Sequence, residues 1–274
     1  MTRLEIDAGQ LPSLFELSLA ALASSRKRPD RTTLGCAGDL SLTVRNLRLD
    51  RRHLRDYLTF FAATAALEAD RILPLPTPFL YLIGQAAQLR LLTLPGFPLP
   101  LPGTVHVGQS FAVRPQGIDP GEPLQLTTGL AELTTTSKGF RFVTETRLWQ
   151  GRQNLGTCRS TYLKRAKVDQ GRKAMSTHRL AGSASHASAT QSSQAAEPAM
   201  ERLRPETVIQ GGDSANHELP IAEWQVPLSR IRGYAWLSRD FNPIHLHSWT
   251  ARLFGFRTPI AHGMMQVGNA WFLL

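Results

Sequence analysis

The residues best placed to do chemistry lie near the end of the chain. Asp240, Asn242, Pro243 and His245 fall within six positions of one another. Pro243 fixes its own φ and disfavours helix at Asn242, so the chain must turn away from any helix that precedes it. Such a turn can aim Asp240 and His245 at one point. A carboxylate and an imidazole that converge can move a proton to or from a water molecule.

The elements that must position these groups begin with a strand and two helices in the first half of the chain. Residues 40–50 alternate between apolar and polar side chains, which predicts a half-buried strand. Asp50 can cap a helix that starts at Arg51, where apolar residues recur at helical spacing. Residues 79–92 are apolar on most sides, which predicts a helix buried by its neighbours.

A run of antiparallel strands is predicted next. The expected strands are residues 104–113, 124–133, 140–150 and 155–163. Glycine-containing turns at 137–139 and 150–152 separate the last three and favour hairpins. A long apolar helix followed by a meander large enough to curl around it is an α+β arrangement.

The same order of elements occurs a second time after residue 205. A strand-like segment, residues 224–228, precedes a helical one, and His262-Gly263 opens an apolar helix as residues 79–82 do upstream. The two halves therefore look like copies of one unit. Only the second copy holds the aspartate–histidine set, so we expect the second half to carry the site and the first to be its partner.

Composition limits the class of protein. The chain has 274 residues, 42% of them hydrophobic, and a net charge of +10. Its two cysteines give neither a disulfide framework nor metal-ligand spacing, which favours a reducing, cytoplasmic setting. No apolar run approaches the roughly 18 residues of a transmembrane helix. Ten basic and two acidic residues lie between Lys138 and Lys173, but no motif of a nucleic-acid-binding protein accompanies them, so nucleic acid is not expected as a partner.

The segment from Ser238 to His245, with His262-Gly263-Met264 beginning seventeen residues later, resembles the signature of the MaoC-like dehydratases and (R)-specific enoyl-CoA hydratases. The resemblance implies a double hotdog, in which an antiparallel sheet wraps around a long central helix. It also implies a division into an N-terminal extension (1–39), a degenerate first hotdog (40–165) and a partial second hotdog (206–274), while the Ser/Ala-rich composition of 166–205 predicts a flexible linker between the hotdogs.

The resemblance also implies a reaction. Asp240 and His245 would hold one water and hydrate a trans-2-enoyl thioester to a (R)-3-hydroxyacyl thioester, or run the reverse dehydration. The backbone N–H of Gly263 would stabilise the thioester enolate. Asn242, Pro243 and His262 are expected to support the motif structurally. The substrate would be bound to coenzyme A or to a carrier protein, with no cofactor and no metal.

Two features of the sequence stand against a complete enzyme. The second unit lacks most of its sheet strands after the helix that Gly263 begins, so it is either truncated or completed by another chain, for which a homodimer is one arrangement. Trp271 takes the place of a serine that assists the site in some members of the family. The alternative is a non-catalytic module that binds an acyl thioester or a carrier protein. The aromatic residues of the second half are expected in the core or along an acyl tunnel: Tyr234, Trp236, Phe254, Phe256 and Trp271.

Overall fold

A computed structural model describes residues 2–26, 40–61, 75–113, 117–166 and 224–273. The expected linker, 166–205, lies outside these residues except for Ala166. Contacts between Cα atoms divide the chain into two units, one made of Met1–Ala181 with Val226–Leu274 and one of Gly182–Gln225. Every helix and strand described below belongs to the first unit. No helix in the described ranges is long and apolar enough to cross a membrane.

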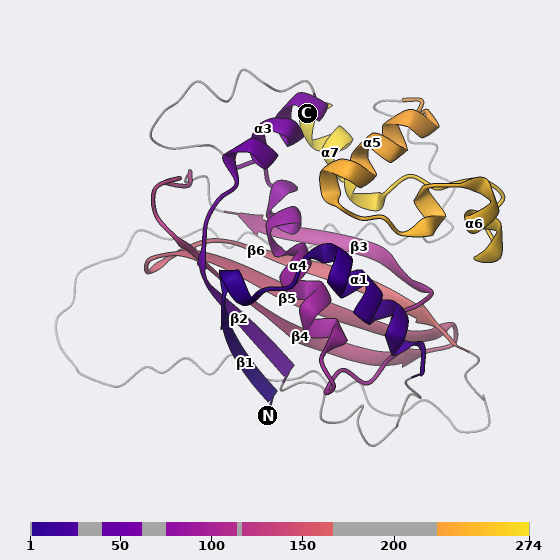
Figure 1. Ribbon diagram of the computed structural model, residues 1–274, viewed down its shortest axis with the longest axis horizontal. Coiled ribbons are helices and arrows are strands. Elements are labelled where there is room, and N and C mark those ends of the chain that lie inside the picture. Colours follow the sequence, from indigo (N-terminus) through magenta and orange to yellow (C-terminus); the bar gives the residue numbers. More distant parts are fainter. Residues whose placement is uncertain (1, 27–39, 62–74, 114–116, 167–223, 274) are drawn as a thin grey trace, which may run out of the picture. The chain divides into compact units, whose positions relative to one another are not determined.

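A six-stranded sheet in the order β1-β2-β4-β5-β6-β3 forms the largest element (Figure 1). The strands are β1 (Thr2–Asp7), β2 (Leu40–Leu47), β3 (Thr104–Val113), β4 (Leu124–Thr136), β5 (Gly139–Gln150) and β6 (Gln153–Arg165). All neighbours are antiparallel except β1 and β2. The five strands expected in the first half of the chain are present, and their alternating burial explains why the pattern was readable. The expected α+β class is confirmed.

The segment expected as an N-terminal extension contributes to this sheet. β1 pairs along its whole length with β2, from Thr2 opposite Leu40 to Asp7 opposite Arg45. Helix α1 (Leu14–Ala23) follows it and packs against α4, with Leu17 buried. No strand was predicted at 2–7, because its side chains are only exposed or half-buried and give a weak pattern.

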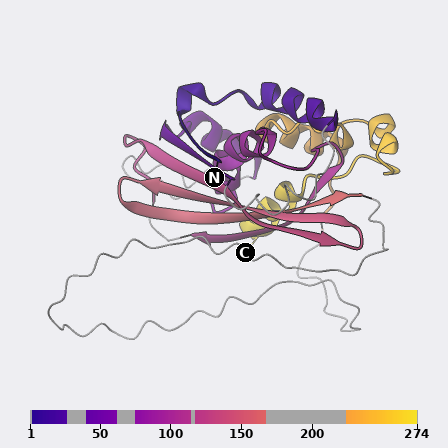
Figure 2. The same ribbon diagram turned by 90° about the horizontal axis from the view of Figure 1, so that it is seen from below.

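The central helix is α4 (Phe79–Thr93), which lies across the sheet. Figure 2 shows it between the sheet and α1. Nine of its residues are buried, and it contacts β2, β4, β5 and β6. One of the nine is polar: Gln88 bonds to Thr146 at 3.0 Å and accepts a hydrogen bond from the Tyr162 hydroxyl at 3.0 Å. A sheet that curves around one buried helix is the architecture that the sequence resemblance implied.

Helices predominate in the second half. They are α5 (Leu228–Ser238), the 3₁₀ turn η5 (Pro243–His245), α6 (Ser248–Leu253) and α7 (Gly263–Leu273). The strand expected at 224–228 is wrong: residues 224–227 have no regular structure and Leu228 begins α5. Pro227 cannot donate to a sheet ladder, and its fixed φ suits the start of a helix. No strand occurs in the described part of the chain beyond residue 224.

Helix α3 (Arg51–Phe60) joins the two halves. Asp50 caps it as expected, accepting hydrogen bonds from the N–H groups of Arg52 and His53. The His53 ring bonds to the carbonyl of Leu237 on α5 at 2.7 Å. Phe61, just after α3, packs against Tyr57, Phe60, Tyr234 and Phe272.

A single hydrophobic core therefore runs through both halves. Four of its buried residues come from the second half: Ile231, Tyr234, Met264 and Met265. Of the aromatic residues expected in the core, Tyr234 is buried and Phe256 is half-buried. The expectation is wrong for Trp236, Phe254 and Trp271, whose side chains are exposed. Trp236 nevertheless packs edge-on against the ring of Phe241.

Candidate active site

Asp240 leaves the end of α5 through a left-handed residue. Arg239 has φ 56° and ψ 24°, a conformation that costs a non-glycine residue free energy but reverses the chain. Ser238 anchors the reversal: its hydroxyl donates to the Tyr234 carbonyl at 2.7 Å and accepts from the Asp240 N–H at 3.3 Å. The chain therefore leaves the direction of α5 at Asp240.

Asn242 and Pro243 shape the turn between Asp240 and His245. A carboxylate oxygen of Asp240 accepts a hydrogen bond from the Asn242 N–H at 3.2 Å. The side-chain oxygen of Asn242 accepts one from the Ile244 N–H at 3.4 Å. Pro243 then occupies the first position of η5, which ends at His245. These two side-chain-to-backbone bonds bring Asp240 and His245 round to the same side.

His245 has one ring nitrogen fixed and one available. The side chain is buried, and Nδ1 lies 2.7 Å from the carbonyl oxygen of Ile260. A carbonyl can only accept, so Nδ1 carries the proton and Nε2 holds a lone pair. The N–H of Ile260 bonds in turn to the carbonyl of Ile244 at 3.2 Å, which holds the two segments together. His245 is thus oriented to act as a base through Nε2.

His262 is the most deeply buried member of the group. Its Nε2 donates to the backbone carbonyl of Asp240 at 3.1 Å, and its Nδ1 is buried with no hydrogen-bond partner among the described residues. Burial, and next the charge of His245, lower the pKa of His262 to about 4. The ring is therefore neutral at pH 7, with its lone pair on Nδ1.

The three side chains meet in one place. One oxygen of Asp240 and one nitrogen each of His245 and His262 lie within 4.8 Å of one another. A water molecule forms hydrogen bonds of about 2.8 Å in each direction, so it can bridge groups up to about 5.6 Å apart. The Asp240 carboxylate and the His245 imidazole can therefore hold the same water.

The same three side chains do not form a metal centre in this arrangement. The rings of His245 and His262 are stacked, with centroids 3.7 Å apart and planes 25° from parallel. An imidazole binds a metal with a lone pair that lies in the ring plane, at about 2.0–2.1 Å. Stacked rings direct these lone pairs along nearly parallel lines, which do not meet at such a distance.

Gly263 supplies an open helix end beside the histidines. It is the first residue of α7, and its N–H has no hydrogen-bond partner among the described residues. A Cβ built on it would have no heavy atom within 4 Å. Helix N-terminal N–H groups attract negative charge, so this position can accommodate an anionic oxygen.

Polar residues from the first half approach the site, and most of them were not predicted from their positions in the chain. The rings of Tyr81, His106 and Tyr162 form a stack, with centroids 5.3 and 4.9 Å apart. Burial is the main cause of the raised pKa of Tyr81, and the nearby Asp240 carboxylate adds to it. Tyr81 stands at the repeat position of His262, which was a usable signal; His106 had none.

One groove outside the site is also present. It measures about 420 Å³ and lies between α3 and α5, where Asp56, Phe60 and Trp236 line it. The groove contains none of the three converging residues Asp240, His245 and His262. The candidate active site is therefore the cluster around Asp240 and not this groove.

Comparison with known proteins bears on this site. Residues 210–272 match the model of the MaoC like domain. Over 45 residues the chain is 49% identical to the 3-hydroxyacyl-thioester dehydratase X of Mycobacterium tuberculosis. Over this segment the chain is similar to MaoC-like domains. The match to the mycobacterial protein spans only 16% of that relative's length and 16% of this chain.

Solved structures resemble a larger part of the chain. The crystal structure of HtdX from M. tuberculosis covers 84% of this chain and 74% of its own, with a TM-score of 0.56 and 19% identity. The MaoC-like dehydratase from Phytophthora capsici covers 88% and 75%, with a TM-score of 0.52 and 17% identity. At these identities the likeness shows the fold, and that fold is the hotdog.

Proposed function

We propose that the chain hydrates and dehydrates acyl thioesters, interconverting trans-2-enoyl and (R)-3-hydroxyacyl forms, as a hydro-lyase. One observation carries the proposal: Asp240 and His245 lie within reach of one water beside the open N–H of Gly263. The matched relatives are named as thioester and MaoC-like dehydratases, which supports the same class of reaction. The substrate is an acyl group carried by coenzyme A or by a carrier protein, and the setting is cytoplasmic.

The steps follow from the positions of the donors and acceptors. In the hydration direction, Nε2 of His245 takes one proton from the water, and the water oxygen bonds to C3 of the enoyl group. The electron pair of the C2–C3 double bond moves towards the thioester carbonyl, whose oxygen becomes an enolate beside the Gly263 N–H. Asp240 orients the water. The proton that His245 has taken then passes through the Asp240 carboxylate to C2. One water has then been added, and both side chains regain their starting state.

His262 acts on Asp240 indirectly in this scheme. Its ring bonds to the backbone carbonyl of Asp240 and stacks on His245, so it fixes both without donating a proton. Asn242 and Pro243 fix the same two residues through the turn. The expected division between catalytic and supporting residues is therefore kept in the proposal.

The test is turnover of crotonyl-CoA, followed by the loss of enoyl-thioester absorbance, with chiral analysis of the product. His245→Ala and Asp240→Asn should each lower kcat by about 10²–10⁴-fold, the usual contribution of a general acid or base. His247→Ala is the matched control, because its side chain is exposed and, among the described residues, its ring bonds only to Arg232. Unchanged activity in His245→Ala sinks the proposal.

A second candidate is a module that binds the thioester without converting it. The absence of any strand among the described residues after 224, and the exposure of Trp271, favour it. Saturable binding of crotonyl-CoA by calorimetry, with no turnover by the same sample, would decide for this candidate.

A further inference from the structure

Helix α6 and the four residues after it present an exposed surface of apolar and basic side chains, which we call the α6 surface: Trp249, Arg252, Leu253, Phe254 and Arg257. Trp249, Arg252 and Leu253 are three and four residues apart and therefore share one face of the helix. Trp249 is 66% exposed and Leu253 75%. Such large apolar side chains, grouped and rimmed by charge, mark an interaction site more often than chance exposure.

The charge of this surface is not neutralised nearby. Asp240 is the sole acidic residue from Trp224 to the end of the chain, against five arginines. Arg252 and Arg257 make no ion pair with the described residues. The sheet differs: Arg141, Arg147 and Arg159 all pair with Glu132 or Glu145. The basic stretch at 138–173 is thus partly neutralised by glutamates of the sheet, whereas the positive charge of the α6 surface is left available to a partner.

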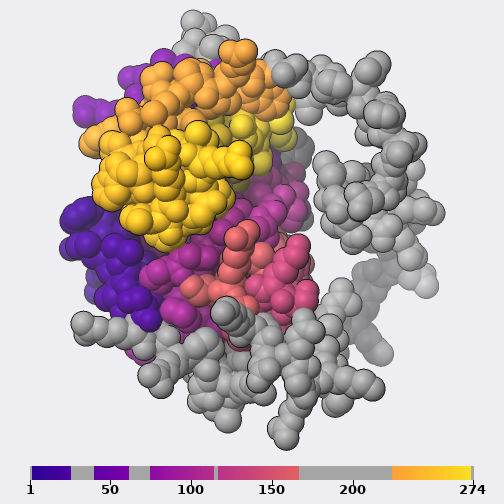
Figure 3. Space-filling model, turned by 90° about the vertical axis from the view of Figure 1, so that its right-hand side faces the viewer, coloured from indigo at the N-terminus to yellow at the C-terminus, as the bar shows by residue number. Residues whose placement is uncertain are grey.

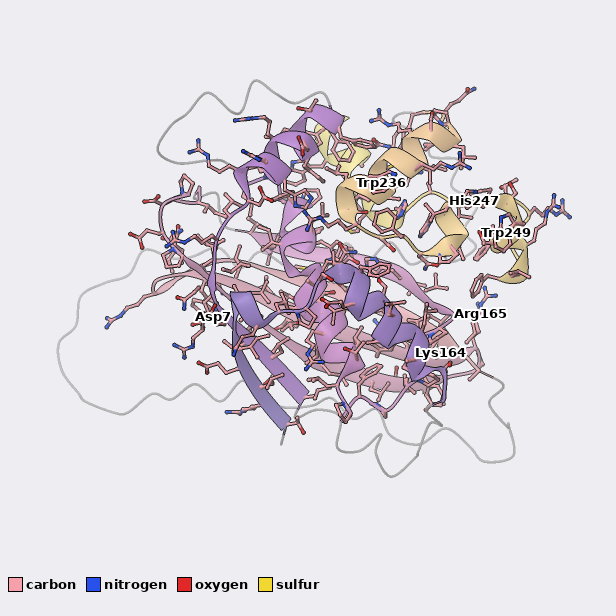
Figure 4. The ribbon with its side chains drawn as sticks, in the orientation of Figure 1. Asp7, Lys164, Arg165, Trp236, His247 and Trp249 are labelled. Carbon is pink, nitrogen blue, oxygen red and sulfur yellow. The ribbon has the colours of Figure 1, made fainter. Side chains whose placement is uncertain are left out.

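The α6 surface is tied directly to the candidate active site. The hydroxyl of Thr250 donates to the carbonyl of Pro243 at 2.6 Å, and α6 begins three residues after His245. Figure 4 shows Trp249 on α6, beyond His247 and away from the sheet. In Figure 3 the yellow atoms of the C-terminal helices make up much of the face towards the viewer. A partner bound here would sit beside the turn that carries His245.

We propose that the α6 surface docks an acidic carrier protein that delivers the acyl thioester to the Asp240–His245 site, an inference that rests on the proposed function. Basic side chains around an apolar centre fit an acidic partner whose contact surface has the same layout. Coenzyme A offers phosphates for the arginines but has no counterpart for three large apolar side chains. An anionic bilayer would also fit the apolar and basic composition of the α6 surface. The position of this surface beside His245, however, is of use only to a partner that brings substrate.

The experiment compares crotonyl thioesters of an acidic acyl carrier protein and of coenzyme A. In Arg252→Glu/Arg257→Glu, we expect KM for the carrier-bound substrate to rise at least about tenfold, with kcat kept, because rim charges act mainly on encounter. The kinetics with crotonyl-CoA should change less than about twofold. Leu253→Ser should raise KM for the carrier-bound substrate and leave the kinetics with crotonyl-CoA unchanged. Arg51→Glu/Arg152→Glu, on α3 and the β5–β6 turn, is the control of equal charge change and should leave both substrates unaffected.

Three results would overturn the docking site. An unchanged KM for the carrier-bound substrate removes it, and equal losses with both substrates assign the arginines to the phosphates of coenzyme A. Binding of the wild-type chain to anionic phospholipid vesicles, lost in the Glu variant while carrier kinetics stay the same, assigns the surface to a membrane. If neither thioester is turned over, the proposed function fails separately. Calorimetry with the carrier protein then still decides the docking. Binding that is lost in Arg252→Glu/Arg257→Glu supports the α6 surface, and binding that is kept contradicts it.

Discussion

His262 links the charge state of the site to the stability of the fold. Its pKa is lowered to about 4 in the folded chain, while a histidine in an unfolded chain titrates near about 6.5. Between these values the unfolded chain binds more protons, so the free energy of unfolding rises with pH. The stabilisation is complete above about pH 6.5 and is lost as the pH falls towards about 4.

We therefore expect chemical denaturation to give a lower free energy of unfolding at pH 4.5 than at pH 7, by on the order of 1–3 kcal/mol from this group. His262→Gln keeps a donor for the Asp240 carbonyl without a titrating ring, and should flatten this part of the pH profile. A profile equally steep in the wild type and in His262→Gln would contradict the assignment of the effect to His262.

Much of the site was readable from the sequence at the scale of single residues. Pro243 and Asn242 predicted the turn, and the spacing to Gly263 predicted that a helix begins close to it. Tyr81 had one signal, its place in the repeat, but the position of His106 was not readable, because it lies more than 130 residues before Asp240 and approaches it through packing alone. The β-bulge after His106, which shifts the register against β6, likewise has no local signal.

At the scale of the element, α7 contains two glycines with opposite surroundings. A Cβ on Gly263 meets nothing within 4 Å, whereas one on Gly268 would lie 2.8 Å from Cε1 of Phe61. Phe61 cannot easily yield, because its ring packs among Tyr57, Tyr234 and Phe272. Gly268 therefore sets how closely α7 approaches α3.

We expect Gly268→Ala to destabilise the fold by about 1–3 kcal/mol through overpacking. Gly263→Ala should leave stability within about 0.5 kcal/mol, since alanine favours helix, but lower kcat/KM at least about tenfold by crowding the enolate oxygen. Thermal unfolding and crotonyl-CoA kinetics on both variants make the comparison. Full activity in a stable Gly263→Ala would contradict a close approach of the enolate oxygen to this position.

Whether a predicted element formed depended on its partners. The apolar character of α4 and the apolar–polar alternation of β4 to β6 were sufficient to predict these elements, because the elements bury residues against one another. The segment at 224–228 has strand-like residues but no described strand beside it, so propensity alone did not make it a strand. β1 shows the reverse: six residues of weak pattern are a strand because β2 lies alongside.

At the scale of the whole molecule, both halves of the chain depend on one core. Ile231, Tyr234, Met264 and Met265 are buried in the same cluster as residues of α3 and α4. A peptide of residues 224–274 should therefore be unfolded by circular dichroism and by amide NMR dispersion. Coexpression with residues 1–181 should recover a helical complex that co-purifies. A well-dispersed spectrum from the peptide alone would show that the second half has its own core.

The parallel pairing of β1 has a practical consequence. β1 is the outermost strand on its side of the sheet, and β2 is the strand that it pairs with. Removing the first seven residues would leave the outer backbone groups of β2 without partners, and β2 carries the buried Leu40, Leu42 and Val44. Recombinant versions trimmed at this terminus should then be prone to inclusion bodies, whereas a tag placed ahead of Met1 with a spacer should be tolerated.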